Sequence, residues 1–236
     1  MLNQIAYDRI LFLDIETVPG VPAYNQLNDK MKSLWDKKSK RIQSQEEKTA
    51  EEAYSKAGIF AEFGKIVCIS CGFSSGKEFR IKSFYGDDER ILLQEFAELL
   101  FRYYDHREAL LCAHNGKEFD FPYIARRMLV NGVQLPVVLD LAGKKPWEVQ
   151  HLDTMELWKF GDYKHYTSLE LLAAIFDIPT PKEDIDGSMV GTVYWYEKNL
   201  QRIVTYCQKD VLTIAQLFRR YQGEPLINDL DVVISD

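Results

Sequence analysis

The stretch ILFLDIETVPG, residues 10–20, constrains the fold more than any other part of the sequence. Its apolar start predicts a buried strand, yet Asp14 and Glu16 follow, two residues apart, at the strand's end. Side chains alternate along a strand, so both carboxylates point to one face. Buried carboxylates are costly unless they are paired or bound to a metal ion. The stretch therefore predicts either a site at the carboxyl end of a central strand or a strand end that emerges into water.

The rest of the chain predicts an α/β domain. Strands are expected at about 10–16, 64–73, 78–86 and 109–115, the middle two joined by the turn SSGK as a hairpin. Helices are expected from Asp87 or Asp88 to about Tyr104, over residues 119–132, and from about Asn199 to Tyr221. We expect a mixed five-stranded sheet with one antiparallel strand and helices on both faces.

The length of 236 residues and a hydrophobic content of 46% suit one substantial core. We therefore expect a single domain, residues 1–236, with a charged helical insertion at about 24–58. The first half of this insertion is basic, from Lys30 to Arg41. Two interpretations are open for it: a solvated helical excursion, or an arm that grips the substrate.

Charge and hydropathy exclude some classes of protein. The formal net charge of −7 gives no general affinity for polyanions, so any contact with nucleic acid must be local or carried by metal ions. No apolar run reaches the ~20 residues of a membrane span, and no signal pattern opens the chain, so we expect a soluble, cytoplasmic protein. Cys68 and Cys71 form a CxxC without a second pair, which favours buried apolar residues over structural zinc.

Two further stretches place acids at the edge of apolar elements. Asp120 follows an apolar strand and the turn HNGK, although it could serve only as a helix N-cap. Tyr206 and Asp210, four apart, share the flank of the last helix, although a boundary tyrosine and a solvated aspartate would look the same. Together with the first motif they make four acids and a phenol, which suits Mg²⁺ or Mn²⁺. Two such ions ~3.5–4 Å apart can clamp a phosphodiester.

The motifs DIET, HNGKEFDFP and YCQKDV, in this order, resemble the three exonuclease motifs of the DEDD superfamily of 3′–5′ exonucleases. The sequence is most similar to the proofreading exonuclease domain of family B DNA polymerases, in a predicted stand-alone form. The resemblance implies an RNase H-like fold and two metal ions. It implies that Asp14 bridges both ions, that Glu16 and Asp210 complete the site nearer the attacking water, and that Asp120 holds the second ion.

The same resemblance implies roles for four more residues. Tyr206, four before Asp210, matches the tyrosine subclass (DEDDy), and we expect it to position the attacking water because a phenol is a poor base at neutral pH. Asn115 and Phe119 fall where the second motif contacts the substrate's 3′ end, and the backbone of Thr17 is expected at the terminal nucleotide. Apart from the resemblance, five cations are either contacts to the substrate backbone or ordinary surface charges: Lys117, Arg126, Arg127, Lys159 and Lys164.

We therefore expect a metal-dependent 3′–5′ exonuclease that releases nucleoside 5′-monophosphates from single-stranded DNA, of the kind used in proofreading and repair. Because only 26 residues follow Asp210, we expect it to trim ends alone or to serve another protein, not to polymerise. Two alternatives stay open: an RNA-trimming exoribonuclease, and a nucleic-acid-binding module that keeps the fold without turnover. Discrimination between DNA and RNA depends on contacts at the 2′ position, which the sequence does not reveal.

Overall fold

A computed structural model describes residues 5–42, 49–106, 108–162, 166–179 and 185–235. Its strands are β1 (Ile10–Pro19), β2 (Gly64–Ser75), β3 (Glu78–Tyr85), β4 (Leu110–Ala113), β5 (Leu152–Asp153) and β6 (Val232–Ser235). Its α-helices are α1 (Asp29–Ser39), α2 (Glu89–Tyr103), α3 (Asp120–Val130), α4 (Thr154–Lys159), α5 (Leu169–Ile175), α6 (Val190–Thr192) and α7 (Leu200–Tyr221). A 3-10 segment, Glu52–Ile59, and a π-helical segment, Val193–Glu197, also shape the site's surroundings.

The strands form one mixed sheet in the order β5-β4-β1-β2-β3-β6. Strand β2 runs antiparallel to β1 and β3, and the other adjacent pairs are parallel. The predicted mixed α/β sheet with one antiparallel strand is therefore confirmed, but it has six strands where five were expected. Two strands, β5 and β6, lie outside the four ranges that the sequence located. They have two and four residues and pair with β4 and β3 from far along the chain, and segments this short carry little local signal.

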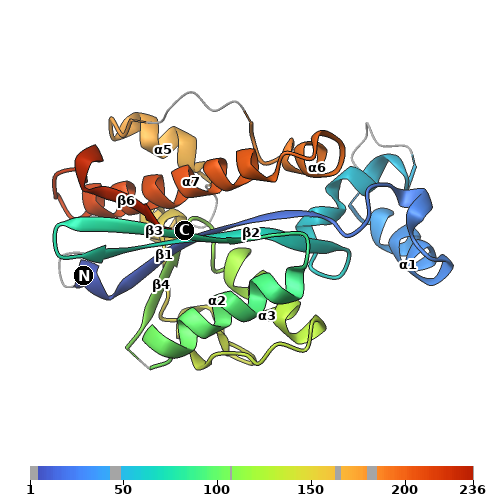
Figure 1. Ribbon diagram of the computed structural model, residues 1–236, viewed down its shortest axis with the longest axis horizontal. Coiled ribbons are helices and arrows are strands. Elements are labelled where there is room, and N and C mark those ends of the chain that lie inside the picture. The colour runs from blue at the N-terminus through green and yellow to red at the C-terminus, as the bar shows by residue number, and fades with distance from the viewer. Residues whose placement is uncertain (1–4, 43–48, 107, 163–165, 180–184, 236) are drawn as a thin grey trace.

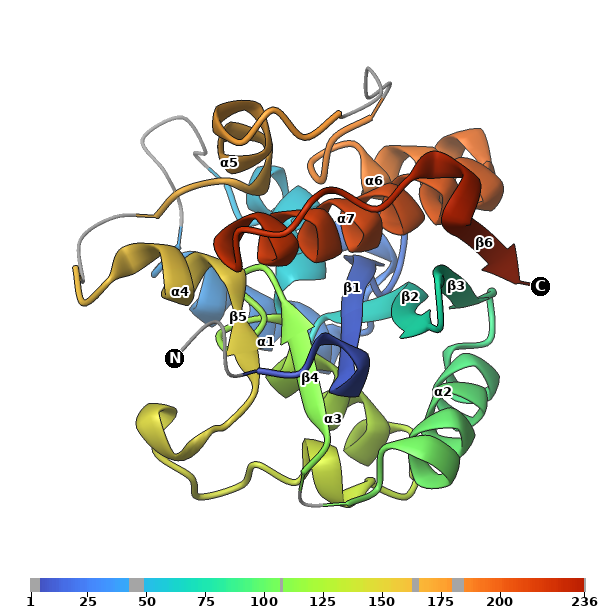
Figure 2. The same cartoon turned by 90° about the vertical axis from the view of Figure 1, so that its left-hand side faces the viewer.

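Helices cover both faces of the sheet (Figures 1 and 2). Helices α2 and α3 lie on one face, over a core that includes Leu11, Leu13 and Phe96. The long helix α7 lies on the other face, where Phe218 packs edge-to-face against Phe12 with ring centroids 5.9 Å apart. Apolar residues alternate between these two cores along β1, which explains why almost the whole strand is buried. The central strand therefore carries its polar residues into a packed interior.

Helix α3 begins where the sequence predicted, but with a different cap. The N-cap is Phe119, and Asp120 is the first helical residue. Pro122 lies in the first turn, where its missing N–H costs nothing, and Gly132 follows the end with a φ of 65°. Because the helix does not need its carboxylate as a cap, Asp120 can point to the carboxyl end of β1.

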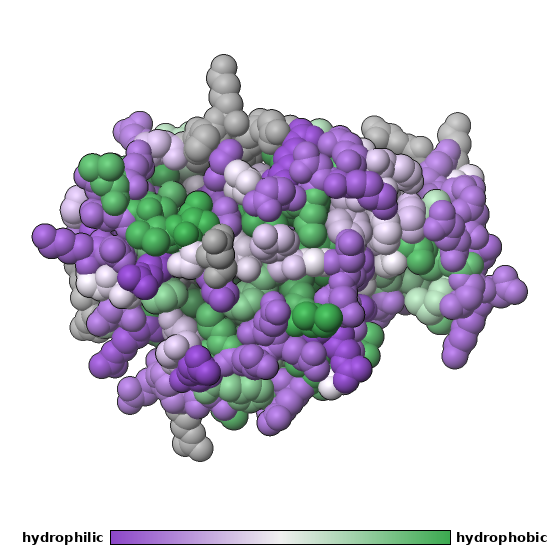
Figure 3. Space-filling view, viewed as in Figure 1, coloured by the Kyte–Doolittle hydropathy of each residue, from purple (hydrophilic) through white to green (hydrophobic). Residues whose placement is uncertain are grey.

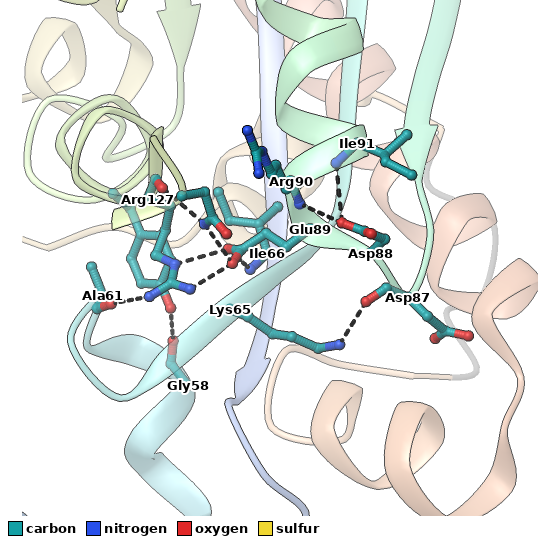
Figure 4. Close-up of polar contacts among 12 residues, drawn as sticks. Gly58, Ala61, Lys65, Ile66, Asp87, Asp88, Glu89, Arg90, Ile91 and Arg127 are labelled. Carbon is teal, nitrogen blue, oxygen red and sulfur yellow. Dashed lines mark hydrogen bonds and ion pairs between the residues drawn. The ribbon is translucent and has the colours of Figure 1, made fainter. Parts of the chain in front are cut away.

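A buried ion pair joins α2 to α3 (Figure 4). The guanidinium of Arg127 donates to both carboxylate oxygens of Glu89, through Nε at 2.9 Å and Nη2 at 2.5 Å. Glu89 also accepts the backbone N–H of Ile66 at 2.7 Å, and Arg127 Nη1 donates to the backbone oxygen of Ala61 at 2.8 Å. This network holds the start of β2 and the segment before it against both helices.

Candidate metal centre

The carboxylates of β1 point toward α7. In the register of the sheet, Asp14 lies opposite Ser70 and Glu16 opposite Cys68 on β2, and the pairing shifts between Glu16 and Thr17. Glu16 is buried and Asp14 half-buried, so neither lies at a freely solvated strand end. The alternative of a strand simply emerging into water is therefore excluded for this pair.

Helix α7 closes one side of the site. The thiol of Cys207 donates to the backbone oxygen and to Oδ2 of Asp14, both at 3.4 Å. One ligand atom each from Asp14, Glu16 and Cys207 lie within 4.8 Å of one another. Asp210, three residues further along the same helix, raises the pKa of Asp14 by electrostatic repulsion, which places its carboxylate beside the cluster.

Asp120 completes the acidic cluster from α3. Its side chain is buried, and its pKa is raised from 3.8 to about 8, first by burial and then by the charges of Asp153 and Asp210. Hydrogen bonds with its own backbone and with that of Ile15 oppose this rise. Asp120 therefore lies next to β1 and close to α7, as the sequence predicted.

Electrostatic repulsion dominates this cluster. Burial raises the pKa of Asp14 well above its usual range. Three neighbouring carboxylates raise it further, in the order Asp210, Glu16 and Asp120. Bringing four acids together in a partly buried place is unfavourable unless a cation neutralises them. Hard divalent cations prefer carboxylate oxygens, so the donor set suits a divalent metal ion.

A fifth acid, Asp153, organises the turn beside the cluster. It is buried at the end of β5, and its two oxygens accept the backbone N–H groups of Asn115 at 3.0 Å and Lys117 at 3.1 Å. Asp153 was not among the site residues predicted from the sequence. Its signal was the same as in the first motif: an acid that ends a short strand and precedes a helix, in the stretch HLDT. Asp153 is also the N-cap of α4.

The turn presents Asn115 with strained backbone geometry. Its φ is 62°, in the left-handed region that asparagine tolerates better than most residues. Its Oδ1 is buried and finds no hydrogen-bond partner among the residues that the structure describes. An unpartnered buried acceptor is costly, so Asn115 is suited to a donor group of a ligand.

The other predicted contact residues lie around Tyr123, one turn into α3. The ring of Phe119 packs against it with centroids 5.3 Å apart, and Phe119 is half-buried. The hydroxyl of Thr17 hydrogen bonds with Tyr123, which in turn donates to the backbone oxygen of Gly58 at 2.7 Å. Tyr123 thus links three segments at the edge of the site, and the side chain of Thr17 is engaged within the protein.

Tyr206 lies on α7 one turn before Asp210, half-buried at the edge of an apolar cluster that includes Val204 and Cys207. It therefore shares the helix face that the sequence predicted for it. Its neighbour Cys207 contacts Asp14, so the start of this turn is fixed against β1.

The predicted backbone contacts have different outcomes. The side chain of Arg127 is only 12% exposed and is held in its ion pair with Glu89, so it is neither an ordinary surface charge nor available to a substrate. Lys117 pairs with Glu156 at 2.5 Å and keeps limited exposure. Arg126 is exposed and Lys159 half-buried, and Lys164 lies outside the described residues.

The CxxC pair is divided by the sheet. Cys68 packs in the core beneath α7, and Cys71 packs in the core beneath α2 and α3. All four cysteines of the chain are free and buried. Since residues three apart on a strand face opposite sides, Cys68 and Cys71 cannot bind one metal ion together.

Comparison with known structures defines the class of fold. The chain is similar to the family B DNA polymerase from the hyperthermophilic archaeon Pyrobaculum calidifontis, with a TM-score of 0.52 and 17% identity. The match covers 87% of this chain and 24% of the polymerase. The six-stranded mixed sheet with its helices is the RNase H-like fold of a polymerase exonuclease domain.

The family follows from the sequence. Residues 59–225 match the family described as a predicted 3′–5′ exonuclease related to the exonuclease domain of PolB, and the chain belongs to this family. A DNA polymerase from Pyrococcus glycovorans is 23% identical over 125 residues, which is 48% of this chain and 16% of that polymerase. Asp14 and Glu16 precede the matched range and reach the site through the pairing of β1 with β2.

A membrane-spanning role finds no support in the helices. Among the described residues, none of them combines the length and the apolar character needed to cross a bilayer.

Proposed function

We propose that the chain is a metal-dependent 3′–5′ exonuclease that removes nucleoside 5′-monophosphates from single-stranded DNA. The observation that carries the proposal is the convergence of Asp14, Glu16, Asp120 and Asp210 from β1, α3 and α7. Their mutual repulsion raises the pKa of Asp14, and a cluster with this property has a use for divalent cations. Family membership supports the choice of reaction.

The four acids divide into two sets of ligands. Asp14 would hold both ions, Glu16 and Asp210 would complete the site nearer the attacking water, and Asp120 would serve the second ion. When bound, two Mg²⁺ or Mn²⁺ ions lower the pKa of the attacking water and stabilise the leaving oxygen. The protein's own contribution is to fix these carboxylates on a strand and two helices, so that little reorganisation is needed during the reaction.

Other side chains would hold the reactants. Tyr206 would orient the attacking water, because a phenol is a poor base at neutral pH. The unpartnered Oδ1 of Asn115 would accept a hydrogen bond from the terminal 3′-hydroxyl. Phe119 would stack against the terminal base, a contact that tolerates any sequence, and the backbone of Thr17 would line the same pocket.

A product ladder tests the proposal. A single-stranded DNA oligomer labelled at its 5′ end is incubated with Mg²⁺ or Mn²⁺, with a chelator control. We expect stepwise shortening and release of 5′-mononucleotides. Asp14→Ala and Asp210→Ala should abolish the shortening of the oligomer without changing the circular dichroism spectrum of the protein. Glu98→Ala, which removes an exposed acid from α2, is the matched control.

Near-normal turnover in either aspartate variant would refute the assignment. A matched RNA oligomer in the same assay separates the deoxyribonuclease from an exoribonuclease with the same acids. Binding of either strand without any shortening, in the presence of both metals, would identify a module without turnover.

A further inference from the structure

The described residues 21–42 and 49–63 form an arm at one end of the sheet, to the right in Figure 1. The arm has a small core of its own, centred on the fully buried Trp35. The indole ring meets Tyr54 and Phe63 edge-to-face at 5.4 and 5.0 Å, and its N–H donates to the backbone oxygen of Ala50 at 2.7 Å. The described part of the arm is therefore packed as a unit and not a loose excursion.

The base of the arm is attached to both walls of the acidic site. On one side Tyr123 and Arg127 of α3 donate to backbone oxygens of the arm, at Gly58 and Ala61 (Figure 4). Helix α3 begins with Asp120. The helix that supplies one carboxylate thus also fixes the arm.

On the other side the π-helical segment before α7 holds the end of β1 and the start of the arm. The indole of Trp195 donates to the backbone oxygen of Pro19 at 3.0 Å, and the hydroxyl of Tyr196 donates to that of Pro22 at 3.2 Å. Helix α7 carries Tyr206 and Asp210. The arm therefore has a fixed orientation relative to α3 and α7, the two helices that carry residues of the candidate site.

Helix α1 turns a cationic face to solvent. Lys30 and Lys37 are exposed and seven residues apart, which puts them on one side of α1 with the exposed Leu34 between them. Arg41, also exposed, lies in the turn that follows the end of the helix at Ser39. Among the described residues no ion pair involves any of the three cations. Residues 29–41 hold six lysines and arginines against two aspartates, in a chain of net charge −7. Hydrophilic side chains dominate this end of the surface in Figure 3.

We propose that the surface formed by Lys30 and Lys37 of α1 and by Arg41 in the turn after it, called here the cationic face, binds the phosphate backbone of the strand under degradation. The inference rests on the proposed exonuclease function for the position of the 3′ end. Its chemistry is that of point charges on phosphates, which gives affinity without sequence preference. The cationic face would attract a polyanion locally, although the net charge of the whole chain, −7, does not.

The arm predicts a length requirement. Five residues of strand separate Asp14 from Pro19, and at 3.3 Å per residue they span roughly 17 Å. At ~3.4 Å per stacked nucleotide, a strand needs about five nucleotides to cover that span. The cationic face lies beyond Pro19, on α1 and the turn after it (Figure 1). Oligomers shorter than about five nucleotides would therefore fill the site without reaching the cationic face.

Binding measured without hydrolysis tests the inference. The triple variant Lys30→Gln, Lys37→Gln, Arg41→Gln keeps good helix formers in place. The matched control is Lys77→Gln, Arg102→Gln, Lys144→Gln, three exposed cations outside the arm. Fluorescence anisotropy with 4-mer and 16-mer single strands is recorded in Ca²⁺ at several salt concentrations, and product analysis verifies that the strands stay intact.

The arm variant should bind the 16-mer more weakly, by ~10- to 100-fold at 0.1 M salt, with a salt slope smaller by about 2. The control variant should bind as the wild type does, and the 4-mer should not distinguish the three proteins. Equal affinity and slope for the 16-mer in all three would overturn the inference. If no protein hydrolyses DNA but the arm variant still loses binding, the proposed function fails while the cationic face stands.

Discussion

The carboxylate of Asp153 accepts the backbone N–H of Asn115 at 3.0 Å, across 38 residues of sequence. The same oxygen caps α4 by accepting the N–H groups of Met155 and Glu156. The second oxygen accepts the N–H of Lys117 at 3.1 Å. One buried acid thus holds the turn that presents Asn115 and the start of the next helix in a single arrangement.

Asp153→Asn should separate the hydrogen bond to the turn, at Lys117, from the cap of α4. The amide keeps one oxygen for the helix cap but loses the second acceptor, so the N–H of Lys117 is left without its bond. We expect KM to rise more than kcat falls, and the free energy of unfolding to drop by ~1–3 kcal/mol. Steady-state kinetics and urea unfolding measure both quantities.

The matched control for Asp153 is Asp88→Asn at the N-cap of α2, which accepts two backbone N–H groups in the same way but lies away from the turn. A control variant with the same rise in KM would show that the effect is not specific to the turn.

Tyr206→Phe should keep metal binding and slow the chemical step. Removal of a group that orients the attacking water costs up to ~10²–10⁴ in rate. Single-turnover hydrolysis of a labelled strand isolates this step, and calorimetry reports metal binding. Tyr221→Phe, on the same helix, removes a hydroxyl that donates to the backbone oxygen of Thr154 and serves as the control. An unchanged single-turnover rate would leave Tyr206 with a packing role only.

The acidic cluster should make metal-free stability fall as pH rises. The pKa of Asp120 is raised from 3.8 to about 8 in the folded protein, chiefly by burial. Between about pH 4 and pH 8 the folded state therefore holds more protons than the unfolded state. The free energy of unfolding then decreases with pH, by up to ~1.4 kcal/mol per unit for each such group.

Urea unfolding in a chelator at pH 5, 6, 7 and 8 measures this dependence. Asp120→Asn should flatten it, and Mg²⁺ or Mn²⁺ should restore stability at pH 8, because the cation replaces the protons. Stability that rises over this range in the chelator would contradict the electrostatic account of the cluster.

Arg127→Met should destabilise the fold without changing any of the four acidic residues of the candidate site. It leaves Glu89, which is 7% exposed, without its ionic partner, and breaking one side of a buried pair costs ~3–5 kcal/mol. Arg126→Met, the exposed neighbour on the same helix, is the control and should stay within ~0.5 kcal/mol of the wild type. Equal stability of the two variants would show that the pair contributes little.

The sequence by itself determined the elements whose signals are local. The apolar run of β1, the hairpin of β2 and β3, and the stripe of α7 each bury a face set by backbone periodicity, so composition and spacing were enough to predict them. Asp14 and Glu16 were predictable as site candidates for the same reason, because they interrupt the apolar pattern of β1. Asp120 and Asp210 had ordinary interpretations of their own, and the resemblance of their motifs to exonuclease motifs singled them out.

The tertiary structure alone decided which distant groups meet. Arg127 looked like a surface charge until α2 placed Glu89 beside it, and Asp153 became important only because β5 lies next to β4. Strand β6 and the attachment of the arm likewise depend on partners more than a hundred residues away. Such pairings are decided by packing geometry and the satisfaction of buried polar groups, and neither is written in any short stretch of sequence.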